Sequence, residues 1–129
     1  MASDFPYMKR IFQEFGDVYY GCCERLDDRL ELVAELPNVR KVSCSPWSDP
    51  ERFASQLPKR LIMSNKPNPA LVASGNLQAM REELEQVMAA AKRHQLGLEM
   101  ILKDNSSVHY RPQLLWEFSR MALELVESW

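Results

Sequence analysis

The sequence contains only four glycines, and none of them belongs to a G-x-G-x-x-G pattern. That pattern normally follows the first strand of an open, doubly wound sheet, where its glycines let the backbone approach a pyrophosphate. The scarcity of glycine therefore gives no support to a dinucleotide-binding fold.

Clustered positive charge is also missing. Sixteen Lys and Arg residues are interspersed with eighteen Asp and Glu residues, and basic residues occur in runs no longer than pairs such as Lys9-Arg10. Nucleic acids bind surfaces on which positive charge is concentrated. We therefore expect no nucleic-acid partner.

Long apolar segments and a disulfide framework are absent as well. No run reaches the roughly 18 apolar residues that suggest a membrane span, and the N-terminal residues do not resemble a secretion signal. The three cysteines are an odd number, with two adjacent at Cys22-Cys23, which does not suit a secreted, disulfide-bonded domain. We expect a cytoplasmic protein with reduced thiols and no membrane segment.

What the sequence does contain is a regular alternation of strand-like and helix-like segments. Helical spacing and capping residues predict helices at 4–15, 27–36, 49–57, 76–95 and 111–126, and short β-branched or aromatic segments predict strands at 18–21, 39–44, 61–64 and 98–102. The apolar stripes of the first, fourth and fifth helices should face the core, including Ile11, Phe15, Leu77 and Val126. The order is one helix followed by four strand–helix units.

This order predicts an α/β fold that is half of a (β/α)8 barrel. Strands alternating with helices form parallel sheets with right-handed crossovers. A complete barrel needs about 250 residues and eight such units, and this chain of 129 residues supplies about half of each in a single domain, residues 1–129. A half-barrel exposes two sheet edges and its inner face. We therefore expect a homodimer or a complementary half-barrel as partner.

The loops after the four predicted strands contain the candidate site residues. In βα architectures, ligands and catalytic groups collect at the carboxyl ends of the strands. The successive loops contain Cys22, Cys23, Glu24 and Arg25, then Cys44, Ser45 and Trp47, then Asn65, Lys66 and Asn68, and finally Lys103, Asp104 and His109.

Two of these cysteines are candidate metal ligands. Neighbouring parallel strands lie roughly 4.8 Å apart, so Cys22 and Cys44 could contact one ion. A third ligand from Glu24, Asp104 or His109 would complete the open site typical of catalytic zinc, which activates a bound thiol or water. The alternative is that the cysteines are small core residues and that His109 is a surface residue. Lys66 and Lys103 are either anion-binding or solvated.

Four segments are similar to proteins of the uroporphyrinogen decarboxylase-like superfamily, and they correspond to the second half of that barrel: Tyr19-Tyr20-Gly21-Cys22-Cys23-Glu24, Ser43-Cys44-Ser45-Pro46-Trp47, Lys66-Pro67-Asn68-Pro69-Ala70 and Leu102-Lys103-Asp104. The resemblance implies one of two chemistries. Decarboxylases of this superfamily act on the acetate arms of a tetrapyrrole without metal or cofactor. Its cobalamin-dependent methyltransferases bind zinc through a histidine-x-cysteine motif, which Tyr20-Gly21-Cys22 matches only at the cysteine.

The resemblance leaves three functional hypotheses. The leading one is methyl transfer to or from a corrinoid or thiol at a zinc–thiolate site. The alternatives are tetrapyrrole decarboxylation and a non-catalytic half-barrel that is the partner of a full-length relative. The assigned roles are metal binding for Cys22 and Cys44, catalysis for Glu24, Asp104 and His109, and substrate binding for Arg25, Trp47, Lys66, Asn68 and Lys103.

Overall fold

A computed structural model describes residues 4–21, 25–102 and 111–129 of the chain. Its four strands form one parallel sheet in the order β1 (Val18–Tyr20), β2 (Val39–Cys44), β3 (Ile62–Asn65) and β4 (Gly97–Met100). The strand order follows the chain order. A doubly wound sheet reverses its order at a switch point, and the described strands show no such reversal.

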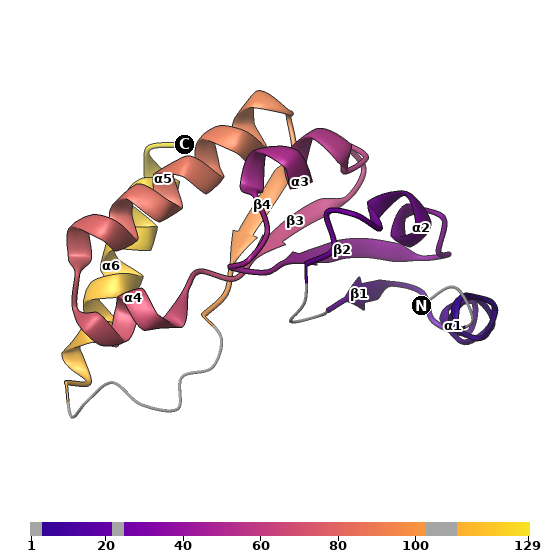
Figure 1. Ribbon diagram of the computed structural model, residues 1–129, viewed down its shortest axis with the longest axis horizontal. Coiled ribbons are helices and arrows are strands. Elements are labelled where there is room, and N and C mark those ends of the chain that lie inside the picture. The colour runs from indigo at the N-terminus through magenta and orange to yellow at the C-terminus, as the bar shows by residue number, and fades with distance from the viewer. Residues whose placement is uncertain (1–3, 22–24, 103–110) are drawn as a thin grey trace.

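Six helices alternate with the strands in the described part of the chain: α1 (Phe5–Phe12), α2 (Leu30–Ala34), α3 (Pro50–Gln56), α4 (Pro69–Ser74), α5 (Leu77–Arg93) and α6 (Gln113–Glu127). Figure 1 shows α2, α3 and α5 over one face of the sheet. We call this the helix face. The opposite face, which we call the open face, carries Tyr19, Lys41, Ser64 and Glu99, and no described helix lies over it. The predicted α/β fold with four parallel strands is confirmed.

Side-chain caps determine where several helices begin. The Asp49 carboxylate accepts hydrogen bonds from the backbone amides of Glu51 and Arg52, and proline occupies the first turn of α3. Asn76 caps α5 in the same way, directly after Gly75, whose φ of 73° ends α4. These boundaries agree with the sequence prediction to within two residues.

Three helix predictions need correction. The first helix ends at Phe12 and not at Phe15, which lies beyond the turn that follows α1. The second helix begins at Leu30 and not at Asp27, because the Asp27 side chain is buried and paired with Arg25. Helix α4 lies where the sequence indicated only a proline-rich loop. Asn68 caps it and Pro69 occupies its first turn, which repeats the Asp49-Pro50 pattern of α3.

The core consists of two apolar clusters. One lies between the helix face and α2, α3 and α5, and includes Val42, Cys44, Phe53 and Met63. The other joins α4, α5 and α6, with Leu84 at its centre. None of the described helices is long and apolar enough to cross a membrane.

Four residues predicted to face the core are exposed instead: Ile11 (57%), Phe15 (58%), Leu77 (36%) and Val126 (51%). Ile11 and Val126 belong to α1 and α6, which meet the core on one side only. Leu77 is the first residue of α5, and Phe15 lies beyond the end of α1. In α1, Phe5, Met8 and Phe12 pack against the core, while Tyr7 and Ile11 form a second apolar stripe on the surface.

Candidate functional site

The predicted site residues fall into two groups. Cys22, Glu24, Lys103, Asp104 and His109 lie outside the described residues, so their proposed roles in metal binding, catalysis and substrate binding remain predictions. The other five, Arg25, Cys44, Trp47, Lys66 and Asn68, are placed at or near the carboxyl ends of the strands, as the barrel interpretation requires.

Arg25 forms a two-point ion pair with Asp27 in the segment between β1 and α2. Arg25 Nη2 lies 2.8 Å from Asp27 Oδ2, and Nε lies 3.3 Å from Oδ1. The Asp27 carboxylate is fully buried, whereas half of the Arg25 side chain is exposed. The hydrogen bond from Arg25 holds the pKa of Asp27 below its ordinary value, against the desolvation that raises it. Arg25 therefore neutralises a buried carboxylate at this edge of the sheet.

Cys44 is the last residue of β2 and its side chain lies in the core on the helix face. It is completely buried, and desolvation, with smaller contributions from the charges of Asp27 and Asp49, raises the pKa of its thiol to about 12. A metal ligand must be a thiolate. The surroundings of Cys44 favour the neutral thiol.

Lys66 lies directly after β3, where the sequence placed it. Its backbone amide donates to the Cys44 carbonyl at 2.9 Å, which continues the pairing of β2 with β3 by one residue. Its ammonium group lies 6.0 Å from the centre of the Tyr19 ring, within the range of a cation–π interaction. This contact places a cation next to the open face.

Trp47 and Asn68 have different positions. Trp47, in the loop between β2 and α3, exposes 63% of its surface. The Asn68 side chain is engaged as the cap of α4, and its backbone amide donates to Glu83 at 3.0 Å. No hydrogen bond among the described residues joins Trp47 or Asn68 to Tyr19, Lys41, Ser64 or Glu99 on the open face, so the structure does not unite all the predicted substrate-binding residues in one place.

The open face has a hydrogen-bonded network that the sequence analysis did not identify. Lys41 Nζ lies 2.6 Å from Glu99 Oε2, and the Ser64 hydroxyl donates to Glu99 Oε1 at 2.7 Å. The Tyr19 hydroxyl lies 3.1 Å from Ser64 Oγ. One residue from each of the four strands takes part, because the parallel register aligns Tyr19 with Lys41 and Ser64 with Glu99.

The formal charges of Lys41, Lys66 and Glu99 add up to a net positive charge at neutral pH. Desolvation raises the pKa of Glu99, but the hydrogen bonds from Lys41 and Ser64 and the charge of Lys41 outweigh it, so that the pKa lies below its ordinary value. Lys41 pairs with Glu99, and Lys66 lies beside the Tyr19 ring of the same network. The surplus positive charge suits an anionic ligand.

A signal for this network exists in the sequence. Lys41 and Ser43 alternate with Val42 and Cys44, and Ser64 and Glu99 interrupt otherwise apolar strands. Strands that are buried on both faces are near-continuous apolar runs. Polar residues at every second position therefore indicate a face that lines solvent or a ligand.

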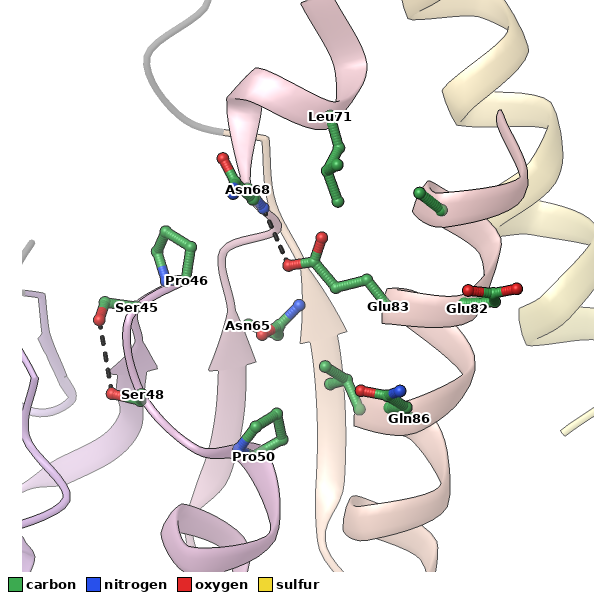
Figure 2. Close-up of a pocket in the computed structure, with 12 residues that line it drawn as sticks. Ser45, Pro46, Ser48, Pro50, Asn65, Asn68, Leu71, Glu82, Glu83 and Gln86 are labelled. Carbon is green, nitrogen blue, oxygen red and sulfur yellow. Dashed lines mark hydrogen bonds between the residues drawn. The ribbon is translucent and has the colours of Figure 1, made fainter. Parts of the chain in front are cut away.

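A cavity of about 380 Å³ lies on the other side of the sheet, between the loop after β2, the end of β3 and helix α5. Figure 2 shows Asn65, Asn68 and Glu83 around it. Asn65 is buried, and its Nδ2 atom has no hydrogen-bond partner among the described residues. Burial raises the pKa of Glu83, although the hydrogen bond from the Asn68 amide opposes this.

The described residues do not fit a zinc site. No group of three His, Cys, Asp or Glu side chains that could hold a metal ion occurs within 4–21, 25–102 and 111–129. Cys44, the only predicted ligand of the metal pair in these ranges, is a core thiol with a raised pKa. Zinc binding remains a prediction that depends on Cys22.

Comparisons of the chain with protein-family models, with curated proteins and with solved structures find no match in any of the three.

Proposed function

We propose that the chain is half of a (β/α)8 barrel of the uroporphyrinogen decarboxylase-like superfamily, and that its open face is one wall of a substrate cavity. The support is architectural. The strands follow chain order, and α2, α3 and α5 lie on one side of the sheet. Parallel sheets are almost always covered on both faces. A barrel interior would cover the open face with other strands.

The covering half would be a second copy of the chain or a complementary half-barrel. Among the described strands, β1 and β4 each pair on one side only, so two sheet edges are available. The first and last helices both carry exposed apolar side chains. They are Tyr7, Ile11 and Phe15 in and after α1, and Trp116, Leu123 and Val126 on α6. Their burial would stabilise such an assembly.

The reaction that this geometry supports best is the metal-free decarboxylation of a carboxylated tetrapyrrole. The observation that carries the proposal is the network of Lys41, Glu99, Ser64 and Tyr19 on the open face, with Lys66 beside it. Lysine ammonium groups bind carboxylates. Zinc-dependent methyl transfer gains no support from Cys44, because its thiol lies in the core.

The test is a titration of the purified chain with uroporphyrin, followed by absorbance, and a turnover assay with uroporphyrinogen. Replacing Lys66 with Met removes one cation and should weaken porphyrin binding by about tenfold. The matched control is Lys59→Met, because Lys59 contacts Gln95 ahead of β3 and away from the network.

Each outcome has a definite meaning. Binding that is lost in Lys66→Met and kept in Lys59→Met supports the substrate wall. Equal binding by both variants, or no binding, contradicts it. Methyl transfer from methylcobalamin to a thiol without porphyrin turnover would favour the methyltransferase alternative. A chain that is inactive in both assays but forms a stable complex with a full-length relative would favour the non-catalytic role.

A further inference from the structure

The cavity between β3 and α5 is separate from the open face. Asn65 follows Ser64 in β3, and successive residues of a strand point to opposite faces. Ser64 belongs to the open-face network, while Asn65 is directed toward the helices and lines the cavity with Val87 of α5. A ligand in this cavity would therefore not compete directly with a ligand on the open face.

Asn65 presents an unused hydrogen-bond donor to the cavity. Only 3% of the residue is exposed, and Nδ2 has no partner among the residues that the structure describes. Figure 2 shows this nitrogen on the side of Asn65 that faces Glu83. Buried polar groups in native proteins are nearly always hydrogen-bonded. A ligand atom that accepts a hydrogen bond would satisfy Asn65.

Glu83 provides an acceptor on the opposite wall. Its carboxylate reaches from α5 toward the loop after β3, where Oε1 accepts the backbone amide of Asn68 at 3.0 Å. The lining includes Glu82 as well as Glu83, and none of its described residues is Lys, Arg or His. An anionic ligand would be repelled. An ammonium group could pair with Glu83 but could not accept the hydrogen bond that Asn65 offers.

A hydroxyl group meets both requirements, because it accepts one hydrogen bond and donates another. The remaining lining suits such a ligand. Ser48 and Gln86 add polar contacts, and Pro46, Pro50 and Leu71 offer apolar surface to C–H groups. The volume of about 380 Å³ lies within the range of roughly 300–1,000 Å³ that is common for small-molecule sites.

We propose that this cavity binds a small, uncharged polyhydroxy compound, a polyol or monosaccharide, with one hydroxyl between Asn65 and Glu83. The site is independent of the substrate wall on the open face. Binding of a polyol to the cavity can be measured without any enzymatic activity.

The experiment is a titration of the isotopically labelled full chain with glycerol, sorbitol and glucose, followed by amide chemical shifts in NMR spectra. Saturable shifts at the Asn65 side-chain amide and at the Asn68 backbone amide are expected for at least one probe. Asn65→Leu keeps a similar volume and removes the donor, so it should weaken binding by about tenfold or more. The same variant should fold normally, because the Nδ2 atom that it removes is buried and has no hydrogen-bond partner in the described part of the chain.

Glu83→Met and Glu85→Met form the matched pair. Glu85 lies on the same helix but outside the cavity, where it pairs with Arg81. Loss of binding in Glu83→Met and retention in Glu85→Met supports the site. The proposal is overturned if no probe gives saturable shifts at these amides, if acetate binds as well as the polyols, or if folded Asn65→Leu binds as tightly as the original chain.

Discussion

The two faces of the sheet are made by alternating residues of the same four strands, yet they differ in chemistry. Val42, Met63 and Cys44 point into the helix-covered core and are fully buried. Their neighbours Lys41, Ser64 and Glu99 form a charged, hydrogen-bonded network on the open face. These helix-face side chains are buried, whereas the open face combines the buried Ser64 with the partly exposed Lys41 and Glu99. The two charged groups are the part of the open face that a ligand could reach.

The largest expected loss of stability follows from a substitution on the helix face. Met63→Ala should lower the free energy of unfolding by about 2–5 kcal/mol, because it removes a fully buried side chain and leaves a cavity. Ile62→Ala changes the adjacent, half-buried residue on the open face and should have less than half of this effect. Urea denaturation of both variants measures the difference. Equal losses would mean that the open face is buried as deeply as the helix face.

The second prediction concerns the reactivity of the Cys44 thiol, which is buried on the helix face. In a chain with Cys22→Ser and Cys23→Ser, the remaining thiol should react with a thiol reagent about a thousandfold more slowly when folded than in urea, because its pKa rises from 9.0 to about 12. Elemental analysis of the original chain is the companion measurement. Stoichiometric zinc that disappears in Cys44→Ala would contradict the core role and revive the metal site.

A smaller loss of stability is expected when Asp27, the buried partner of the Arg25–Asp27 ion pair, is replaced. Asp27→Asn should destabilise the chain by about 1–2 kcal/mol at neutral pH, since it weakens a charged hydrogen bond. Asp28→Asn is the control, because the Asp28–Arg52 pair is exposed and should contribute less than about 0.5 kcal/mol.

The same pair predicts a pH dependence. The pKa of Asp27 is lowered in the folded chain, so the unfolded chain binds a proton first as the pH falls. The stabilisation is complete above the unfolded pKa of about 3.9 and is lost as the pH falls through the lower folded value. Denaturation at several pH values should therefore show the Asp27→Asn difference shrinking in acid. A difference that stays constant would contradict the pairing.

The smallest effect on stability belongs to the open face. Glu99→Gln should change the free energy of unfolding by less than about 1 kcal/mol, because the Lys41–Glu99 pair is partly exposed and screened by solvent. It should also strengthen uroporphyrin binding, since it removes the negative charge that pairs with Lys41. Titration of this variant beside Lys66→Met tests the charge argument. Weaker binding in both variants would contradict it.

Much of the candidate site could not be predicted from the sequence because it depends on long-range contacts. The Lys41–Glu99 pair joins residues 58 positions apart, and it forms only because β3 lies between β2 and β4 with Ser64 in register. The environment of Asn65 Nδ2, which has no partner within the described ranges, likewise depends on how α5 packs against the end of β3. Lys66, by contrast, was placed correctly because its position depends only on where a strand ends.

The sequence by itself determined the alternation of strands and helices and several of their boundaries, because apolar periodicity and capping by Asp49 and Asn76 act within a few residues. Tertiary structure decided which side of each element is buried. Ile11 and Val126 are apolar and helical, yet they remain exposed, because a helix buries only the side that meets another element. It also decided that Cys44 is a core residue: β2 turns that side chain toward the helices, where desolvation opposes a thiolate.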